Sequence, residues 1–297
     1  IRDAQESRGL GDVYKRQLFG NKNKTGRTLS RLVNVKLYTS RDKAGFSFGA
    51  VVRQAPRATA TVCFQVENPD EIDSGQIWDW EQAISEDESV IATSYTVDAT
   101  GSYMAVTFKQ LDKAERKDSN EALTRLAAQL PDFYEFGEVV STPMTEEQIY
   151  ERVASAVDTK TGQWPELAVD TVKETTTTIA FDDMAAVSFD VMDDGDLDAL
   201  LRELVLEGEL AGVARWTRIF RPGSEAEEND PGRHSGVLTV AAATSVSQIE
   251  DAAATLIGEL SAVERLRVRR IYGRQMAGFL AGLGIGELVW DAEKVTV

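Results

Sequence analysis

The sequence has few of the residues that build disulfides and metal sites. Its 297 residues include one cysteine, Cys63, and one histidine, His234. A single cysteine excludes an intramolecular disulfide, and a zinc site of cysteine and histidine needs about four ligands. No apolar run approaches the roughly 20 residues of a membrane-spanning helix. We therefore predict no metal site and no cofactor, and no membrane span within these residues.

Positive charge is also scarce over most of the chain. The sequence has 32 Lys and Arg against 49 Asp and Glu, and its net charge is −17. An acidic surface repels phosphate backbones, so this composition disfavours general nucleic-acid binding. The balance is uneven, because residues 1–59 carry a net charge of +9 and the rest carry −26. The length suggests about two domains at roughly 150 residues each.

The N-terminal segment differs from the rest of the chain. Residues 1–3 and 8–17 resemble a sequencing adapter translated in frame, an artefact of metagenomic assemblies. We expect residues 1–17 to be disordered and exclude them from reasoning on the fold; the alternative is a natural disordered N-terminus. Residues 18–45 form a basic lead-in with one strand, in which Val33, Val35 and Leu37 alternate with polar residues.

The same order of elements occurs twice after this lead-in. Apolar periodicity predicts strand, helix, strand, strand, helix and strand between Thr59 and Val140, and the order recurs between Ala185 and Tyr272. An antiparallel sheet with two helices on one face has this βαββαβ order in the ferredoxin-like arrangement. We predict an α+β fold with two ferredoxin-like domains at 46–158 and 184–274, a connector at 159–183, and a C-terminal helix with a Gly-rich tail at 275–297.

Particular segments carry this prediction. Thr145 and Gln148 form a capping box that starts a helix. The predicted strands include Thr59–Glu67, Ser89–Val97, Tyr103–Lys109, Phe133–Val140, Ala185–Val191, Ala214–Phe220, Ser235–Ala242 and Arg265–Tyr272, and the predicted helices include Ile77–Ser85, Asp118–Leu130 and Val246–Val263.

No pattern of catalytic residues emerges from the sequence. Gly282, Gly284 and Gly286 follow a predicted helix, whereas a dinucleotide loop follows a strand, so we expect helix termination and close packing there. His234 falls in a polar loop and is expected to be solvated, and Cys63 alternates within a strand as a packed thiol. We therefore predict that the chain is not an enzyme and takes no small-molecule substrate.

One set of residues is a candidate interaction face. Arg265, Arg267 and Arg269 share one face of a predicted strand, and Trp216 and Arg218 fall together on another. One face of a ferredoxin-like sheet can be open, and these residues would form a basic stripe on it. The first interpretation is a surface that docks another protein. The alternative is a nucleic-acid-binding face, since RNA-recognition domains stack bases on an open sheet.

Segments near the C-terminus resemble a known family, and in outline the resemblance covers about residues 45–290. The strand Gly236–Ala242, an Ala-rich helix, the segment 266–270, the motif Tyr272-Gly273-Arg274-Gln275 and the closing segment 283–286 follow one another as in EccE-like actinobacterial membrane proteins of conjugation and type VII secretion. The residues that carry the motif are Tyr272, Gly273 and Gln275.

The resemblance implies a function and a location. The chain would be the cytoplasmic, non-enzymatic region of a component anchored in the cell membrane, and it would dock other secretion or conjugation subunits, including an ATPase. The family's N-terminal membrane helices are absent from this sequence. A basic segment directly after a membrane helix agrees with the positive-inside rule, so we expect those helices upstream of Leu18. The alternative for this segment is an ordinary basic linker.

Overall fold

The computed structural model describes residues 35–53, 58–110, 112–157, 172–181, 184–192, 196–210, 213–223 and 232–288. The predictions for residues 1–17 and for most of the lead-in lie outside these ranges, as do those for 158–171 and 289–297. Within the described residues, no helix is long and apolar enough to cross a membrane.

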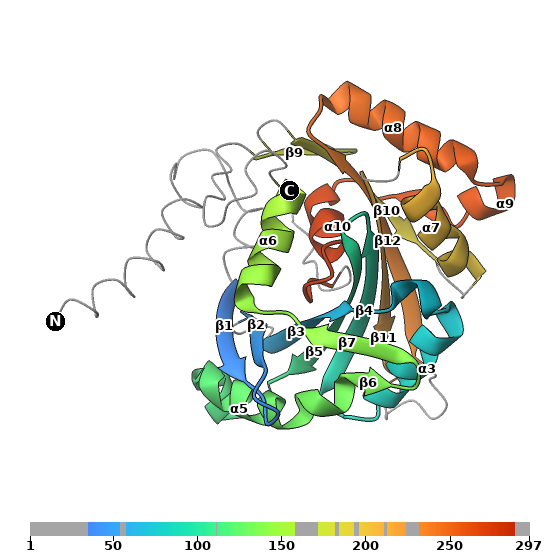
Figure 1. Ribbon diagram of the computed structural model, residues 1–297. Helices are drawn as coiled ribbons and strands as arrows, with labels where there is room; N and C mark the ends of the chain where they lie inside the picture. Colours follow the sequence, from blue (N-terminus) through green and yellow to red (C-terminus); the bar gives the residue numbers. More distant parts are fainter. Residues whose placement is uncertain are drawn as a thin grey trace.

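One antiparallel sheet runs through the fold (Figure 1), in the order β1-β2-β3-β5-β4-β11-β12-β10-β9-β8. The prediction of helices combined with an antiparallel sheet is confirmed. The strands on this path are β1 (Val35–Arg41), β2 (Ser47–Arg53), β3 (Thr59–Val66), β4 (Val90–Asp98), β5 (Gly101–Lys109), β8 (Val172–Glu174), β9 (Ile179–Phe181), β10 (Met184–Val191), β11 (Ala214–Arg221) and β12 (Arg233–Ala242).

The two halves of the sheet have matching strand orders. In the first half, β7 (Val139–Pro143) pairs with one end of β3, which gives the order β7-β3-β5-β4. In the second half, β13 (Val268–Arg270) pairs with one end of β10, which gives the order β13-β10-β12-β11. The halves meet where β4 pairs with β11, from Asp98 opposite Arg215 to Thr93 opposite Phe220. The two halves therefore share a single sheet.

Four helices cover one face of this sheet. They are α3 (Ser74–Ile84), α5 (Ser119–Gln129), α7 (Asp196–Glu207) and α8 (Val246–Glu259). Their apolar stripes join the alternate strand residues on this face, such as Val62 and Phe64, in one buried cluster. Shorter elements connect these parts: η1 (Pro69–Glu71), α4 (Lys113–Lys117), η2 (Leu130–Phe133), β6 (Glu135–Phe136) and α9 (Ala262–Arg265).

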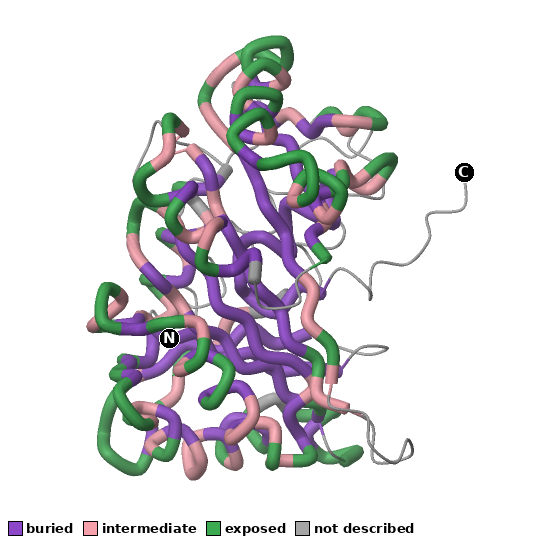
Figure 2. The backbone as a smooth tube through the Cα atoms, turned by 90° about the vertical axis from the view of Figure 1, so that its right-hand side faces the viewer, coloured by how far each residue is buried: buried purple, intermediate pink, exposed green. Residues whose placement is uncertain are grey.

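Two further helices and the C-terminal segment cover the opposite face. The helices are α6 (Glu146–Val157) and α10 (Gln275–Ala281). Leu283 and Ile285, which follow α10, are buried in the same cluster as Cys63 of β3. The strands are accordingly buried along most of their length, while exposed residues lie on the outer helices and loops (Figure 2). The prediction that one sheet face is open is therefore wrong.

Small residues allow the C-terminal segment to lie close to the sheet. A Cβ would lie 2.8 Å from Thr239 Oγ1 at Gly282, 2.3 Å from Thr96 Oγ1 at Gly284 and 1.9 Å from Thr61 Oγ1 at Gly286. The hydroxyls of this row are paired across strands, including Thr61 with Thr107 and Thr96 with Thr217. The predicted close packing of the glycine run is confirmed.

Most predicted elements are present, and two predicted strands are wrong. The capping box of Thr145 and Gln148 forms at the start of α6. The predicted strand 133–140 is divided into β6 and β7 by a turn at Gly137, which has a positive φ of 59°. The predicted strand 265–272 is reduced to β13, because a capping box of Ser261 and Glu264 starts a helix ahead of it.

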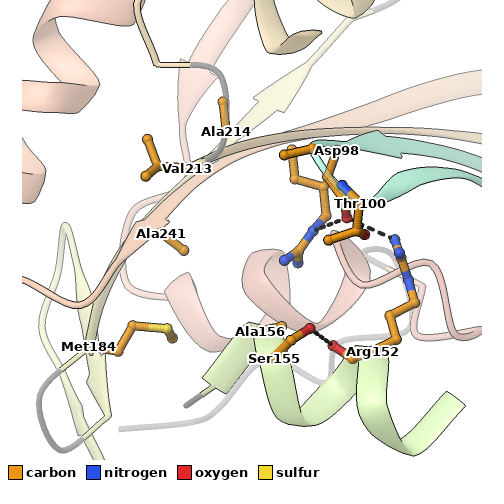
Figure 3. A pocket seen from close by; sticks show the side chains of 11 residues that line it. Asp98, Thr100, Arg152, Ser155, Ala156, Met184, Val213, Ala214 and Ala241 are labelled. Atoms are coloured by element: carbon orange, nitrogen blue, oxygen red, sulfur yellow. Dashed lines mark hydrogen bonds and ion pairs between the residues drawn. The ribbon is translucent and has the colours of Figure 1, made fainter. Parts of the chain in front are cut away.

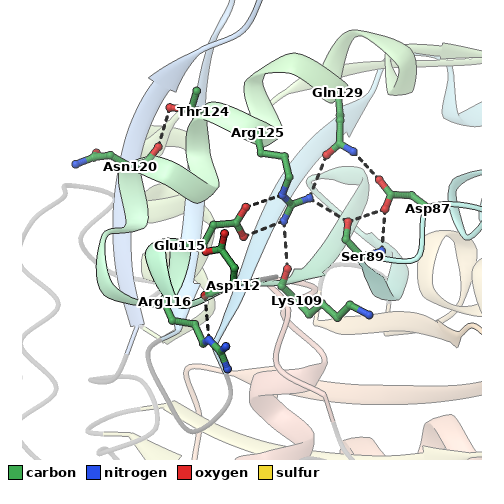
Figure 4. Close-up of polar contacts among 10 residues, drawn as sticks. All are labelled: Asp87, Ser89, Lys109, Asp112, Glu115, Arg116, Asn120, Thr124, Arg125 and Gln129. Atoms are coloured by element: carbon green, nitrogen blue, oxygen red, sulfur yellow. Dashed lines mark hydrogen bonds and ion pairs between the residues drawn. The ribbon is translucent and has the colours of Figure 1, made fainter.

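A polar network fixes α4 and α5 to the sheet in the first half (Figure 4). Arg125 of α5 donates to Glu115 of α4 at 2.8 Å, to the Ser89 hydroxyl at 3.0 Å and to the Lys109 carbonyl at 3.2 Å. Gln129, one turn later, contacts both Arg125 and Asp87. One guanidinium thereby connects three elements, which is a structural role.

Candidate functional site

The structure does not bring the predicted interaction residues together. Trp216 and Arg218 of β11 are buried, with 0% and 2% exposure, on the sheet face that α3 and α7 cover. The indole Nε1 of Trp216 donates to Asp198 of α7 at 2.8 Å, and Arg218 pairs with Glu81 of α3 at 3.1 Å. Arg218 therefore joins the two halves, Trp216 connects β11 to α7 within the second half, and neither side chain belongs to a surface.

His234 belongs to this buried cluster, which corrects the prediction of a solvated loop histidine. It lies on β12, with its Nε2 2.9 Å from Glu81 Oε2 and 2.9 Å from Arg218. Its ring is flanked by Trp78 and Phe220, each at a centroid distance of 4.7 Å. Burial raises the pKa of Glu81, against the lowering effect of its His234 and Arg218 partners. The cluster connects α3 of the first half to β11 and β12 of the second.

The three arginines near the C-terminus lie on different elements. Arg265 ends α9 and is exposed, Arg267 lies in the following turn and donates to the Met192 carbonyl at 3.2 Å, and Arg269 is exposed on β13. Exposed apolar side chains accompany them: Val263 and Leu266 are each 72% exposed, and Met192 is 57% exposed. We call Met192, Val263, Arg265, Leu266 and Arg269, together with the backbone of β13, the β13 edge surface.

Among the described residues, no strand pairs with the outer side of β13. In the described residues β13 pairs only with β10, with Arg269 opposite Asp190. The amide of Ile271 donates to Ser188, and the carbonyl of Arg267 accepts from Met192. Alternation along an antiparallel strand then directs the amides and carbonyls of Val268 and Arg270 away from β10. Such an edge can accept a further strand.

The family-like motif 272–275 has a structural role in the fold. Gln275 is fully buried; its side chain accepts from the Ser188 amide at 2.7 Å and donates to the Ser188 carbonyl at 3.2 Å. Gly273 has a φ of +69°, and its amide donates to the Thr176 carbonyl at 2.8 Å. Tyr272 is 65% exposed. Gln275 and Gly273 thus hold the turn between β13 and α10 against the sheet.

A pocket lies on the sheet face that α6 covers, where the two halves join (Figure 3). Its volume is about 270 Å³. Asp98, at the end of β4, lies 3.2 Å from Arg152 of α6 and 3.3 Å from Arg215 of β11. The guanidinium of Arg152 also stacks 3.6 Å from the centre of the Tyr103 ring. The remaining lining residues are Ala99, Thr100, Ser155, Ala156, Met184, Val213, Ala214 and Ala241.

The charged side chains of this pocket shift one another's pKa values. Burial acts to raise the pKa of Asp98, but Arg152 and Arg215 outweigh it and lower that pKa below its usual value. Burial and the neighbouring Arg152 lower the pKa of Arg215 to about 10, although Asp98 opposes this. Sequence reasoning missed this site, because Asp98, Arg152 and Arg215 lie on separate elements and no local pattern connects them.

Cys63 is a packed thiol, as predicted. It is 2% exposed on β3, and its Sγ lies 3.9 Å from the Gly284 carbonyl. Burial raises the pKa of the thiol to about 12, even though Arg152 lowers it. Among the described residues, no group of His, Cys, Asp and Glu is arranged to hold a metal ion.

Comparison with known proteins gives few matches. No family model matches the sequence, and no curated protein matches it. Among solved structures, chitooligosaccharide oxidase aligns with a TM-score of 0.31 and 12% identity over 76% of this chain and 47% of its own. BBE-like 1 from Physcomitrella patens aligns at 0.31 and 13% identity over 80% and 54%, and a variant of it at 0.32 and 10% over 84% and 62%. This chain therefore spans less than two thirds of each.

These matches correct one prediction. The chain was expected not to be an enzyme, and an oxidase among the solved structures that it matches contradicts that expectation. A TM-score near 0.3 transfers neither an activity nor a cofactor to this chain.

Proposed function

We propose that this chain is a docking component of a membrane-anchored secretion or conjugation apparatus, in which it binds other subunits on the cytoplasmic side. The resemblance to EccE-like proteins, which in outline covers about residues 45–290, motivates the choice of apparatus. We also propose that the two halves, at 46–158 and 184–274, are ferredoxin-like domains. The orders β7-β3-β5-β4 and β13-β10-β12-β11, with two helices on one face of each half, support this.

The observation that carries the docking proposal is the β13 edge surface. Large apolar side chains on a monomer surface are usually scattered, and a group beside an unpaired strand edge is typical of an interaction site. Val263 lies in α9 and Leu266 directly follows this helix, and both are exposed; the Met192 amide donates to the carbonyl of Arg267 in the next turn. In the first half, by contrast, the corresponding strand β7 is paired with β6.

The occupant that we propose is an extended, acidic segment of a partner subunit that adds a strand to β13. Main-chain bonds to Val268 and Arg270 would supply affinity, as in other strand-addition complexes. Exposed Arg265 and Arg269 would select carboxylates, while Leu266 and Met192 would contact apolar side chains of the same segment. Because most of the protein is acidic, these local positive charges would determine where an acidic partner segment binds.

The nucleic-acid alternative depended on an open sheet face carrying Arg265, Arg267 and Arg269, whereas both faces of the sheet are covered and these arginines lie on different elements. Trp216 is fully buried, so it offers no face for base stacking. We therefore do not propose this function, and single-stranded nucleic acid is included below as a competing ligand.

The docking proposal is tested with short labelled peptides and fluorescence anisotropy. The first alternates Glu with Val, the second alternates Lys with Val, and the third repeats the first with N-methylated amides on the edge that would pair. We expect the Glu-Val peptide to bind, and the other two to bind at least about tenfold more weakly. Equal binding of all three peptides, or tighter binding of a single-stranded oligonucleotide, contradicts the proposal.

Variants identify the surface used. Arg269→Glu should weaken the Glu-Val peptide about tenfold, because it places like charge beside the added strand. Arg116→Glu is the matched control, since Arg116 is an exposed arginine on α4 in the other half. An equal effect of both substitutions would show that the peptide responds to net charge and would reject the β13 edge as the site.

A further inference from the structure

The pocket between α6 and the sheet has the composition of an anion-binding site, and it is independent of the β13 edge surface. Two guanidiniums and one carboxylate line it, which leaves an excess of one positive charge. The side chains of Arg152, Asp98 and Arg215 are only 7%, 12% and 13% exposed. A buried excess charge is costly unless a counter-charge compensates it.

Donors in the pocket also remain unused. The Nη1 atoms of Arg152 and Arg215 are both buried and have no hydrogen-bond partner within the part of the chain that the structure describes. Both arginines contact the same oxygen, Oδ2 of Asp98. Arg152 also donates from Nε to the Leu283 carbonyl. Arginine presents five donors in a planar fork that matches carboxylate and phosphate oxygens. The oxygens of an anion bound in the pocket would be acceptors for these donors.

The other walls of the pocket are small and mostly apolar. Met184, Val213 and Ala241 lie across the pocket from Arg152 (Figure 3), and Ala156 of α6 also lines it. The hydroxyl of Ser155 donates to the Arg152 carbonyl and shares this wall. The volume of about 270 Å³ is slightly below the usual range of about 300–1,000 Å³ for ligand pockets. It suits a few carbon atoms joined to one charged group.

We propose that this pocket binds a small organic anion, whose carboxylate or phosphate group lies between Arg152 and Arg215 and whose short apolar part lies against Met184 and Val213. Burial, and after it the charge of Arg152, lowers the pKa of Arg215, so a bound anion would stabilise its charged form. Because α6 belongs to the first half and β11 to the second, such a ligand would bridge the two halves of the chain.

Isothermal titration with butyrate, butyl phosphate, inorganic phosphate and butylamine tests this proposal. We expect butyrate or butyl phosphate to bind and butylamine not to bind. Binding of butyrate alone assigns a carboxylate, and binding of butyl phosphate alone assigns a phosphate ester. Binding of inorganic phosphate as tightly as butyl phosphate would overturn the apolar part of the proposal. Absence of binding by both organic anions at millimolar concentration would overturn all of it.

Two substitutions with opposite expected effects separate a ligand site from a structural ion pair. Arg215→Gln removes a donor and a charge, so the affinity for the anion should fall at least about tenfold. Asp98→Asn removes the competing carboxylate while keeping both arginines, so the affinity should rise. A ligand that binds the folded state raises its unfolding temperature. The shift caused by the anion should therefore follow the order of affinities among the folded variants. A loss of affinity in both variants would show that the ion pair only maintains the fold and would reject the proposal.

Discussion

Gly286 lies directly on the side chain of Thr61, so that a Cβ at position 286 would come within 1.9 Å of Thr61 Oγ1. Its φ of +82° is also a conformation that glycine adopts without strain and other residues do not. We predict that Gly286→Ala lowers the free energy of unfolding by about 2 kcal/mol or more, measured by urea denaturation.

The matched control for this prediction is Gly258→Ala. Gly258 lies in α8 with no atom near the position of an added Cβ. There the substitution should stabilise the protein by about 0.5–1 kcal/mol, because alanine favours the helix. If Gly286→Ala were as stable as the wild type, the C-terminal segment would not lie on the sheet as described.

Asp98 provides a pH-dependent prediction. Its pKa is lowered in the folded protein, because Arg152 and Arg215 outweigh the effect of burial. The unfolded state therefore binds the proton more tightly, and ionised Asp98 contributes stability above its unfolded pKa of about 3.9. That contribution is lost as the pH falls through the lower, folded pKa. We predict that Asp98→Asn is destabilising near neutral pH and that its difference from the wild type shrinks below about pH 4.

Urea titrations of both proteins across this range measure the effect. Asp70→Asn is a suitable control, since Asp70 is exposed. The free energy of unfolding of this control should differ from that of the wild type by a small and constant amount. A constant difference for Asp98→Asn over the same range would contradict the assigned ion pairs.

Cys63 provides a prediction on reactivity. The thiolate is the reactive form, and burial raises the pKa of this thiol to about 12. We predict negligible labelling by iodoacetamide in the folded protein near neutral pH, and complete labelling in urea. Because Cys63 is the only cysteine, mass spectrometry of the intact chain reads this directly. Rapid labelling without denaturant would show that β3 is accessible and that α6 and the C-terminal segment do not cover it.

Local sequence patterns predicted much of the secondary structure. The helix that starts at Thr145 follows from a capping box, and the buried alternation of Val62, Cys63 and Phe64 follows from the period of a strand. These features depend on neighbouring residues only. The glycine run 282–286 was also correctly read as close packing, because its position after a helix excludes a dinucleotide loop.

Long-range features could not be predicted in the same way. The junction of the halves depends on pairing between β4 and β11, and the pocket depends on Asp98 and Arg215, which are 117 positions apart. The cluster of Glu81 and His234 spans 153 positions. Without knowledge of the sheet order, His234 belongs to a polar stretch and Trp216 to an unassigned strand face, so both were placed in solvent.

The docking proposal depends most directly on the outer edge of β13. Hydrogen exchange of single amides, followed by NMR with and without the Glu-Val peptide, measures it. In the free protein we expect fast exchange at Val268 and Arg270 and slow exchange at Arg269, which faces β10. Saturation with the peptide should slow exchange at Val268 and Arg270 at least about tenfold and leave Arg269 unchanged. Unchanged exchange at Val268 and Arg270 in the bound state would contradict the proposal.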